Sequence, residues 1–288
     1  MYTDYIEHSK ASPAAVATLN LVREPDAHCD ISPNASIGNN VQIGYGTRIF
    51  DSAEIGDNTI IGDHCLIGLP VAASTARTCI GPDSVIRSHA VIYQGVEVGP
   101  QFQTGHHALV RDGVRAGVNL RLGSFSDLEG EAVIGDYCRF HGYVQLARGT
   151  RVGSFVWLFS FTILTADPLP PSHFEKATTI EDGVVVCVGC SILPGTILRR
   201  GAFVCAGSCA RGEVPPGGVV DGHQGEVIAH ITQLRNRQLG IEHPWMNHFA
   251  DAYPEAAQAR IRALHQEIIN QIPLYKEARS RRKGRLVR

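Results

Sequence analysis

Four histidines are the residues of this chain whose type and spacing best suit proton-transfer chemistry. His106 and His107 are adjacent, His89 lies 18 residues before His107, and His141 follows further along the sequence. A neutral imidazole can accept a proton from an attacking group, because the ordinary pKa of histidine lies close to neutral pH. Which of these side chains can act together depends on the elements that position them.

Those elements are set by a repeat of six residues. An aliphatic residue recurs every six positions over 37–67, 80–164 and 180–210, and glycine often follows it. The fifth residue of each hexapeptide is mostly small or β-branched, as at Thr47 and Cys65. One large and one small inward residue per six suit a narrow prism with three flat faces, so a fixed period of this kind predicts a solenoid.

Three hexapeptides make one triangular coil, so residues 18 apart should stack. Neighbouring coils then hydrogen-bond like parallel strands at a spacing of about 4.8 Å, and each coil stabilises the next. The sequence predicts an all-β solenoid over 31–222, with loops at 69–79 and 165–179 where the frame breaks. His89 should stack on His107, and a packing column of aromatic rings should continue through Phe125, Tyr143 and Phe161.

The period is lost after residue 222. Apolar spacing over 225–239 and 254–272 indicates two helices. We expect residues 223–288 to form a C-terminal helical segment that caps the open end of the prism and finishes in a solvated basic tail. We expect residues 1–30 to be a separate N-terminal segment.

The repeat resembles that of the hexapeptide-repeat acyltransferases, which fold as left-handed parallel β-helices. The stretch TGHHAL (104–109) is most similar to the nucleotide-sugar N-acyltransferases among them. In that family a histidine at the third position of the hexapeptide commonly acts as the general base, and His106 occupies this position. The resemblance implies transfer of an acetyl or related acyl group from acyl-CoA to the amino group of a nucleotide-linked amino sugar. It also implies a homotrimer with the active site in a cleft between chains.

Other residues of the same edge are expected to contact the acceptor substrate. Because residues 18 apart stack, His89 and His107 lie beside His106, and His141 lies two coils further on, roughly 10 Å along the axis. We therefore expect His89, His107 and His141 to be substrate-binding residues. For His107, packing within the aromatic column is the competing interpretation.

A second resemblance lies in the segment FVCAGSCARGEVPPGGVVDG (203–222). It is similar to the closing segment of the hexapeptide acetyltransferases, which borders the coenzyme A arm. By this resemblance Ala206, Gly207 and Ser208 would approach the pantetheine, and Arg211 would reach a phosphate. Cys205 and Glu213 depart from the usual pattern. The proline-rich stretch at 164–172 resembles a loop that would border a cleft between subunits.

The bulk composition fits a globular protein and gives no indication of a nucleic-acid or membrane partner. The chain has 288 residues, of which 44% are hydrophobic and 19% charged, and its formal net charge is −2. The N-terminus is polar, unlike a signal peptide. The eight cysteines do not resemble a disulfide framework. We therefore expect a cytoplasmic protein with reduced thiols and no metal centre.

Several alternatives remain open at this point, both for the base and for the reaction. The thiolate released from coenzyme A, or a bound water, could take the proton while His106 only positions the sugar. The acceptor could be a sugar hydroxyl, as in an O-acetyltransferase. A zinc enzyme like the γ-type carbonic anhydrases needs three convergent histidines; His89 and His107 could share a metal, but no third ligand is obvious. A non-catalytic β-helix scaffold is the fourth possibility.

Overall fold

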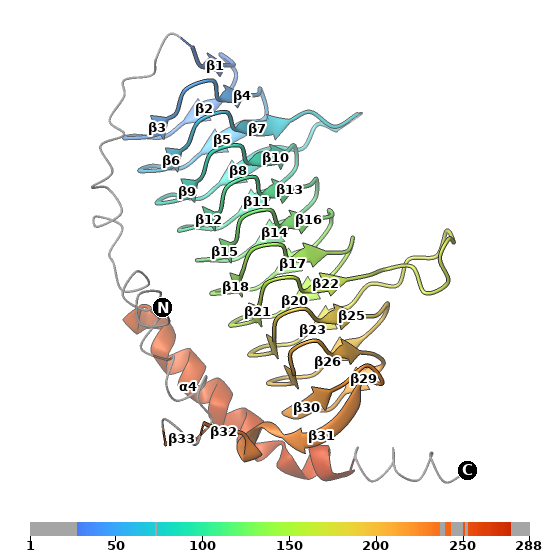
Figure 1. Cartoon of the computed structure of the whole chain (residues 1–288). Coiled ribbons are helices and arrows are strands. Elements are labelled where there is room, and N and C mark those ends of the chain that lie inside the picture. The colour runs from blue at the N-terminus through green and yellow to red at the C-terminus, as the bar shows by residue number, and fades with distance from the viewer. Residues whose placement is uncertain (1–27, 73, 237–239, 243–249, 251–252, 278–288) are drawn as a thin grey trace.

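The computed structural model describes residues 28–72, 74–236, 240–242, 250 and 253–277. They form a left-handed β-helix, a three-sided prism of stacked coils (Figure 1). Each side is one long sheet of short strands, and we name the sides A, B and C. The predicted solenoid fold is therefore confirmed.

The strands recur in the order A, B, C along the chain. Sheet A contains β1 (Asp30–Ile31), β4 (Arg48–Ile49), β7 (Leu66–Leu69), β10 (Val91–Tyr93), β13 (Leu109–Val110), β16 (Asp127–Leu128), β19 (Gln145–Leu146), β22 (Ile163–Leu164), β25 (Ser191–Ile192) and β28 (Cys209–Ala210). Sheet B contains β2 (Ser36–Ile37), β5 (Ala53–Ile55), β8 (Thr78–Ile80), β11 (Glu97–Val98), β14 (Arg115–Ala116), β17 (Val133–Ile134), β20 (Arg151–Val152), β23 (Thr179–Ile180), β26 (Ile197–Leu198) and β29 (Glu213–Val214). Sheet C contains β3 (Gln42–Ile43), β6 (Ile60–Ile61), β9 (Val85–Ile86), β12 (Gln103–Thr104), β15 (Arg121–Leu122), β18 (Arg139–Phe140), β21 (Trp157–Leu158), β24 (Val185–Val186), β27 (Phe203–Val204), β30 (Gly218–Asp221) and β31 (Glu226–His230).

The register follows the predicted repeat of 18 residues. Leu109 of β13 pairs in parallel with Val91 on one side and with Asp127 on the other. Where a loop is inserted the separation grows, so Val91 pairs with Leu66. Because each strand hydrogen-bonds to the coils before and after it, the prism satisfies its backbone between coils.

The core contains one exchange of large and small side chains that the repeat pattern did not predict. Phe102 and Leu120 occupy the usually small fifth position and are fully buried. Thr104 and Ala116 occupy the usually large first position of the same stretch. The total volume is thus kept while the positions are exchanged, as a close-packed interior requires.

Two loops project from the same edge of the prism, the edge where the chain passes from sheet A to sheet B (Figure 1). One follows β7 and ends at β8, and the other follows β22 and ends at β23. Both fall where the sequence predicted breaks in the frame. The loops are described apart from residue 73.

The predicted helix over 225–239 is wrong within its described part. Residues 226–230 form β31, which pairs antiparallel with β30, and a single 3-10 turn follows at Ile231–Gln233. The last strand of a solenoid has an unpaired edge, and a hairpin satisfies those backbone groups. Val227 packs against the core from this strand. Pairing of the free edge of β30 therefore decides the structure of residues 226–230, although their apolar spacing is helical.

The second predicted helix is confirmed as α4 (Glu255–Asn270). Its apolar face packs through Ala257, Ile261, Leu264 and Ile268. Arg260 of α4 forms an ion pair of 2.9 Å with Asp136, which lies in the turn between sheets B and C. Strands β32 (Arg235–Asn236) and β33 (Ile241–Glu242) form a small separate hairpin. Most of the N-terminal segment and the basic tail lie outside the described residues.

Candidate functional site

The predicted catalytic residue lies on the edge where the chain passes from sheet C to sheet A, which we call the C–A corner. It consists of the turns at 44–47, 62–65, 87–90, 105–108, 123–126, 141–144, 159–162, 187–190 and 205–208. His106 is the third residue of its hexapeptide in the turn between β12 and β13 and is exposed. The corner therefore presents one side chain from each coil at a fixed position.

The backbone of His106 is held by the next coil. Its N–H donates to Ser124 Oγ at 3.0 Å, and its carbonyl accepts from the N–H of Phe125 at 3.0 Å. Its imidazole makes no hydrogen bond with any of the residues that the structure describes. The turn thus fixes the backbone position of His106, and both ring nitrogens stay available for hydrogen bonds. No carboxylate of a described residue orients the ring.

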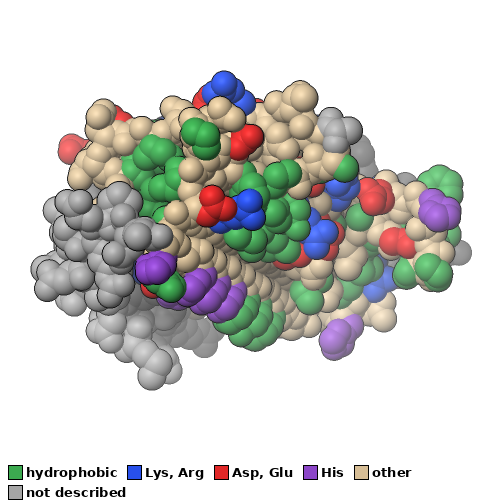
Figure 2. All heavy atoms as spheres, turned by 90° about the horizontal axis from the view of Figure 1, so that it is seen from above, with side chains coloured by type: hydrophobic (Ala, Val, Ile, Leu, Met, Phe, Trp, Pro, Cys, Tyr) green, Lys and Arg blue, Asp and Glu red, His purple; other side chains and the backbone are tan. Residues whose placement is uncertain are grey.

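His107 and His89 belong to a continuous column of rings at the fourth position of the hexapeptides. We call it the ring ladder, and it contains His64, His89, His107, Phe125, Tyr143 and Phe161. Neighbouring rings are stacked, with centroids between 4.7 Å (His89 to His107) and 5.2 Å (His64 to His89). Figure 2 shows a row of histidine side chains that runs on into hydrophobic side chains.

The ladder confirms the predicted packing column and limits what His107 can do. His89 covers one face of the His107 ring and Phe125 the other, at 4.7 Å and 4.9 Å. All six residues have a positive φ, between 55° and 65°, so the backbone points every ring in the same direction. Only the ring edge of His107 faces solvent, next to His106.

His141 lies apart from this column. It is the second residue of its hexapeptide, and its ring stacks on Phe159 at 4.4 Å and is tilted against Trp157 at 6.2 Å. Burial lowers the pKa of His141 below its ordinary value. Trp157 lies on sheet C, so His141 leans toward that sheet. Its ring therefore packs against one aromatic side chain of the corner, Phe159, and one of sheet C, Trp157, both on the next coil.

The predicted donor segment lies further along the same corner. Ala206, Gly207 and Ser208 form the turn between β27 and β28, five coils from His106, or about 24 Å at the spacing of β-strands. Ala206 and Gly207 are exposed, whereas Ser208 is buried. The Ser208 hydroxyl accepts from the Gly222 N–H at 3.0 Å, so it holds the closing hairpin.

Arg211 follows β28, at the edge where the chain passes from sheet A to sheet B, and is exposed. Its guanidinium donates to the carbonyl of His223 at 2.9 Å and to Gln224 Oε1 at 3.3 Å. These contacts fix the cation beside the hairpin and leave further N–H groups for an anion, since a guanidinium has five.

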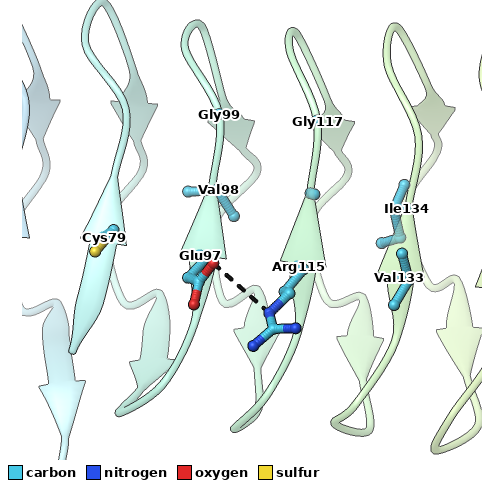
Figure 3. A pocket seen from close by; sticks show the side chains of 9 residues that line it. Cys79, Glu97, Val98, Gly99, Arg115, Gly117, Val133 and Ile134 are labelled. Atoms are coloured by element: carbon cyan, nitrogen blue, oxygen red, sulfur yellow. Dashed lines mark ion pairs between the residues drawn. The ribbon is translucent and has the colours of Figure 1, made fainter. Parts of the chain in front are cut away.

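A pocket among the described residues lies elsewhere. A shallow pocket of about 400 Å³ opens on sheet B, where Cys79, Glu97, Arg115 and Val133 line it (Figure 3). An ion pair of 3.6 Å joins Glu97 and Arg115 across it. The pocket contains none of the predicted site residues. It reaches in to Ala116, the small inward residue of the exchanged core stretch.

The cysteines are all free thiols. Cys65, Cys138 and Cys190 hold the fifth, inward position of their hexapeptides and are buried in the core. Cys187 lies three residues before Cys190, but it is on the corner while Cys190 points inward. Burial raises the pKa of Cys187 to about 12 and that of Cys65 to about 11. These thiols stay protonated at neutral pH and are poor nucleophiles.

Two further findings concern metals and membranes. Within the described ranges, no group of three or more His, Cys, Asp or Glu side chains is arranged to hold a metal ion. None of the described helices is long and apolar enough to cross a bilayer.

Asp127 is a polar group that the sequence reasoning missed. It faces outward from sheet A between Leu109 and Gln145, and Arg111 lies 3.4 Å from its Oδ2. Its Oδ1 is buried and accepts no hydrogen bond from a described residue. Burial raises the pKa of this carboxyl above its ordinary value. The only sequence signal was an acidic residue two positions after a ladder ring.

Comparison with known proteins supports the fold. The sequence matches no protein-family model and no curated protein sequence. The solved structure of a UDP-N-acetylglucosamine acyltransferase from Arabidopsis is similar, with a TM-score of 0.60 and 19% identity, covering 71% of this chain and 73% of that one. A UDP-N-acetylglucosamine acyltransferase from Bacteroides fragilis has a TM-score of 0.41 and 16% identity, covering 84% of this chain and 90% of that one. The expected resemblance to hexapeptide-repeat acyltransferases is thus confirmed at the level of the fold.

Proposed function

We propose that this protein is an acyltransferase that moves an acetyl or related acyl group from acyl-CoA to the amino group of a nucleotide-linked amino sugar. The observation that carries the proposal is His106, an exposed imidazole whose backbone is fixed by Ser124 and whose ring nitrogens are free among the described residues. The fold shared with the Arabidopsis acyltransferase supports the reaction class.

In the proposed reaction His106 acts as the general base. The amine nitrogen attacks the thioester carbonyl carbon, and His106 takes the proton that the nitrogen loses. The carbon–sulfur bond then breaks with its electron pair on sulfur, and the proton passes to this thiolate. The products are an amide and free coenzyme A. A positioned base of this kind contributes about 10²–10⁴-fold to the rate.

The proposed substrate contacts follow from the corner. The outer edges of His89 and His107 lie beside His106 and would contact the acceptor sugar. His141 was predicted to do the same, but its lean toward sheet C makes it a contact for a group bound over that sheet. Ala206, Gly207 and Arg211 would border coenzyme A, with Arg211 toward a phosphate. Ser208 would act through its backbone, because its hydroxyl is engaged with Gly222.

We propose that the active site is completed in a homotrimer. His106 stands on an exposed edge and does not line the shallow pocket on sheet B. The loop between β22 and β23 carries Leu169 and Phe174, each 77% exposed. Apolar side chains projected on a loop suit burial against a second copy of the chain. Light scattering of the purified protein would give the mass of the assembly directly.

The test of the reaction is a thiol-release assay with acetyl-CoA and longer acyl-CoA donors across a panel of amino-sugar nucleotides. We expect His106→Ala to lower turnover by about 10²-fold or more. His64→Ala is the matched control, since His64 is an exposed histidine of the same corner that is not assigned to the site. The turnover of this variant should stay near wild type.

The alternatives predict different outcomes of that assay. Thiol release with sugar hydroxyls but not with amines would assign O-acylation to the same base. Near-normal turnover in His106→Ala would mean that the released thiolate or a water takes the proton. If no acceptor causes thiol release, the non-catalytic β-helix scaffold or the zinc enzyme would be favoured. For the zinc enzyme, the described residues contain no cluster of three metal-binding side chains.

A further inference from the structure

The ring ladder stops abruptly at Phe161. The fourth residue of the next two hexapeptides at this corner is glycine, at Gly189 and Gly207, and both keep the positive φ of the ladder, 70° and 69°. Phe161 is 54% exposed. No ring of a described residue stacks on the face of Phe161 that points toward Gly189. The ladder therefore ends in an uncapped aromatic ring.

The space beyond Phe161 is open. A Cβ atom placed on Gly189 or Gly207 would have no heavy atom within 4 Å. A glycine alone does not create such a gap, because Gly46 lies in the same column and the His64 ring fills the space beside it. Two rungs of the ladder are thus missing, which leaves about 10 Å of corner length at the spacing of β-strands.

The other two edges of these coils are covered by the chain itself. Ile268 of α4 lies over Gly201 at the edge between sheets B and C. Lys176 of the loop between β22 and β23 lies over Gly195 at the edge between sheets A and B. The part of the C–A corner beyond Phe161 has exposed apolar side chains, Val188 within it and Ile163 beside it, 48% and 41% exposed.

A fixed cation lies beside the hairpin turn that follows the far end of this gap. Gly222 is hydrogen-bonded to the turn through Ser208 and Cys209. The guanidinium of Arg211 is held by the two residues that follow, His223 and Gln224. A ligand in the gap would thus meet an aromatic face at one end and a positive charge at the other.

We propose that a nucleobase stacks on the free face of Phe161, above Gly189 and Gly207, and that its phosphate is bound by Arg211. A nucleobase is planar and similar in size to the aromatic rings that form the ladder. Stacking on an aromatic ring stabilises it without base-specific hydrogen bonds. Arginine is well suited to a phosphate. The inference rests on the proposed function, which supplies two nucleotides, the adenosine of acyl-CoA and the nucleotide of the acceptor sugar.

The test is calorimetric titration of the full chain with 3′,5′-ADP, the nucleotide end of coenzyme A, and in a second arm with UDP. Phe161→Ala should weaken binding of one of them by roughly fivefold to a hundredfold. Gly189→Phe should do the same by filling the gap with a ring of the chain's own, since Phe161 and Phe125 show that phenylalanine accepts this backbone conformation. Phe161→Tyr, which keeps the aromatic face, should bind like wild type.

Phe125→Ala is the matched control, because it removes an equally exposed ring (50%) two rungs before the end. Its nucleotide affinity should stay within about twofold of wild type. Circular dichroism verifies that each variant is folded. The arm that shows the loss identifies which substrate supplies the base.

Three results would overturn the inference. Unchanged affinity in Phe161→Ala, an equal loss in Phe125→Ala, or no binding of either nucleotide by wild type each excludes stacking at Phe161. If the Phe161 variants change the mass of the assembly but not nucleotide binding, the corner is occupied by a second copy of the chain instead. Thiol release by wild type in any of these cases would leave the proposed acyl transfer standing.

Discussion

The imidazole rings of His89 and His107 lie 4.7 Å apart with 3° between their planes, although 18 residues separate them in the sequence. Both residues hold the fourth position of a hexapeptide, with φ of 65° and 56°. The repeated backbone conformation therefore aligns the rings, and stacking follows from the coil spacing. A side chain at this position contributes to packing whether or not it has a chemical role.

Substitution of His107 should separate its packing from any contact with substrate. His107→Phe should keep the free energy of unfolding near wild type, because a phenyl ring can stack between His89 and Phe125. His107→Ala should lower it by about 0.5–1.5 kcal/mol, the worth of an aromatic pair. His107→Gly controls for the positive φ, since glycine adopts it without cost. Urea unfolding measures the difference, and equal losses in the phenylalanine and alanine variants would contradict the packing role.

His141 should make the protein sensitive to mild acid. Burial lowers its folded-state pKa, so the unfolded chain binds more protons below its ordinary value of about 6.5. The free energy of unfolding contributed by the buried neutral ring is thus complete above that pH and is lost as the pH falls from about 6.5 toward the folded-state pKa.

His141→Gln cannot take up this proton and should show a smaller loss of stability between pH 7 and pH 5 than wild type. Thermal melts at several pH values measure the effect, and both proteins should respond alike between pH 7 and pH 8. The same slope in both proteins below pH 6.5 would show that His141 does not cause the acid sensitivity.

The exchanged core stretch should depend strongly on Phe102. Phe102 is fully buried, so Phe102→Ala should cost about 3–5 kcal/mol through lost burial and the cavity that remains. Phe125→Ala removes the same ring from an exposed position and should cost much less. Chemical unfolding of the two variants compares them. Similar losses would mean that the coil collapses around Phe102 and that this ring does not support the core.

The repeat alone was sufficient to predict the coils, their register and the ladder. Its period decides which side chains point inward, because every coil repeats the same backbone conformation, so the buried Cys65, Cys138 and Cys190 and the stacked His89 and His107 could be placed from spacing. The breaks in the period likewise located both projecting loops. The position of His106 on an exposed corner follows from the same regularity.

The tertiary structure alone decided the contacts that are not repeated from coil to coil. The spacing of residues 225–239 fits a helix, yet the unpaired edge of β30 makes residues 226–230 a strand. His141 turns toward Phe159 and Trp157, the Ser208 hydroxyl is engaged by Gly222, and the corner beyond Phe161 stays open while α4 and a loop cover the other two edges. A sequence period specifies what each coil shares with its neighbours, whereas these features depend on where non-repeating segments pack against the prism.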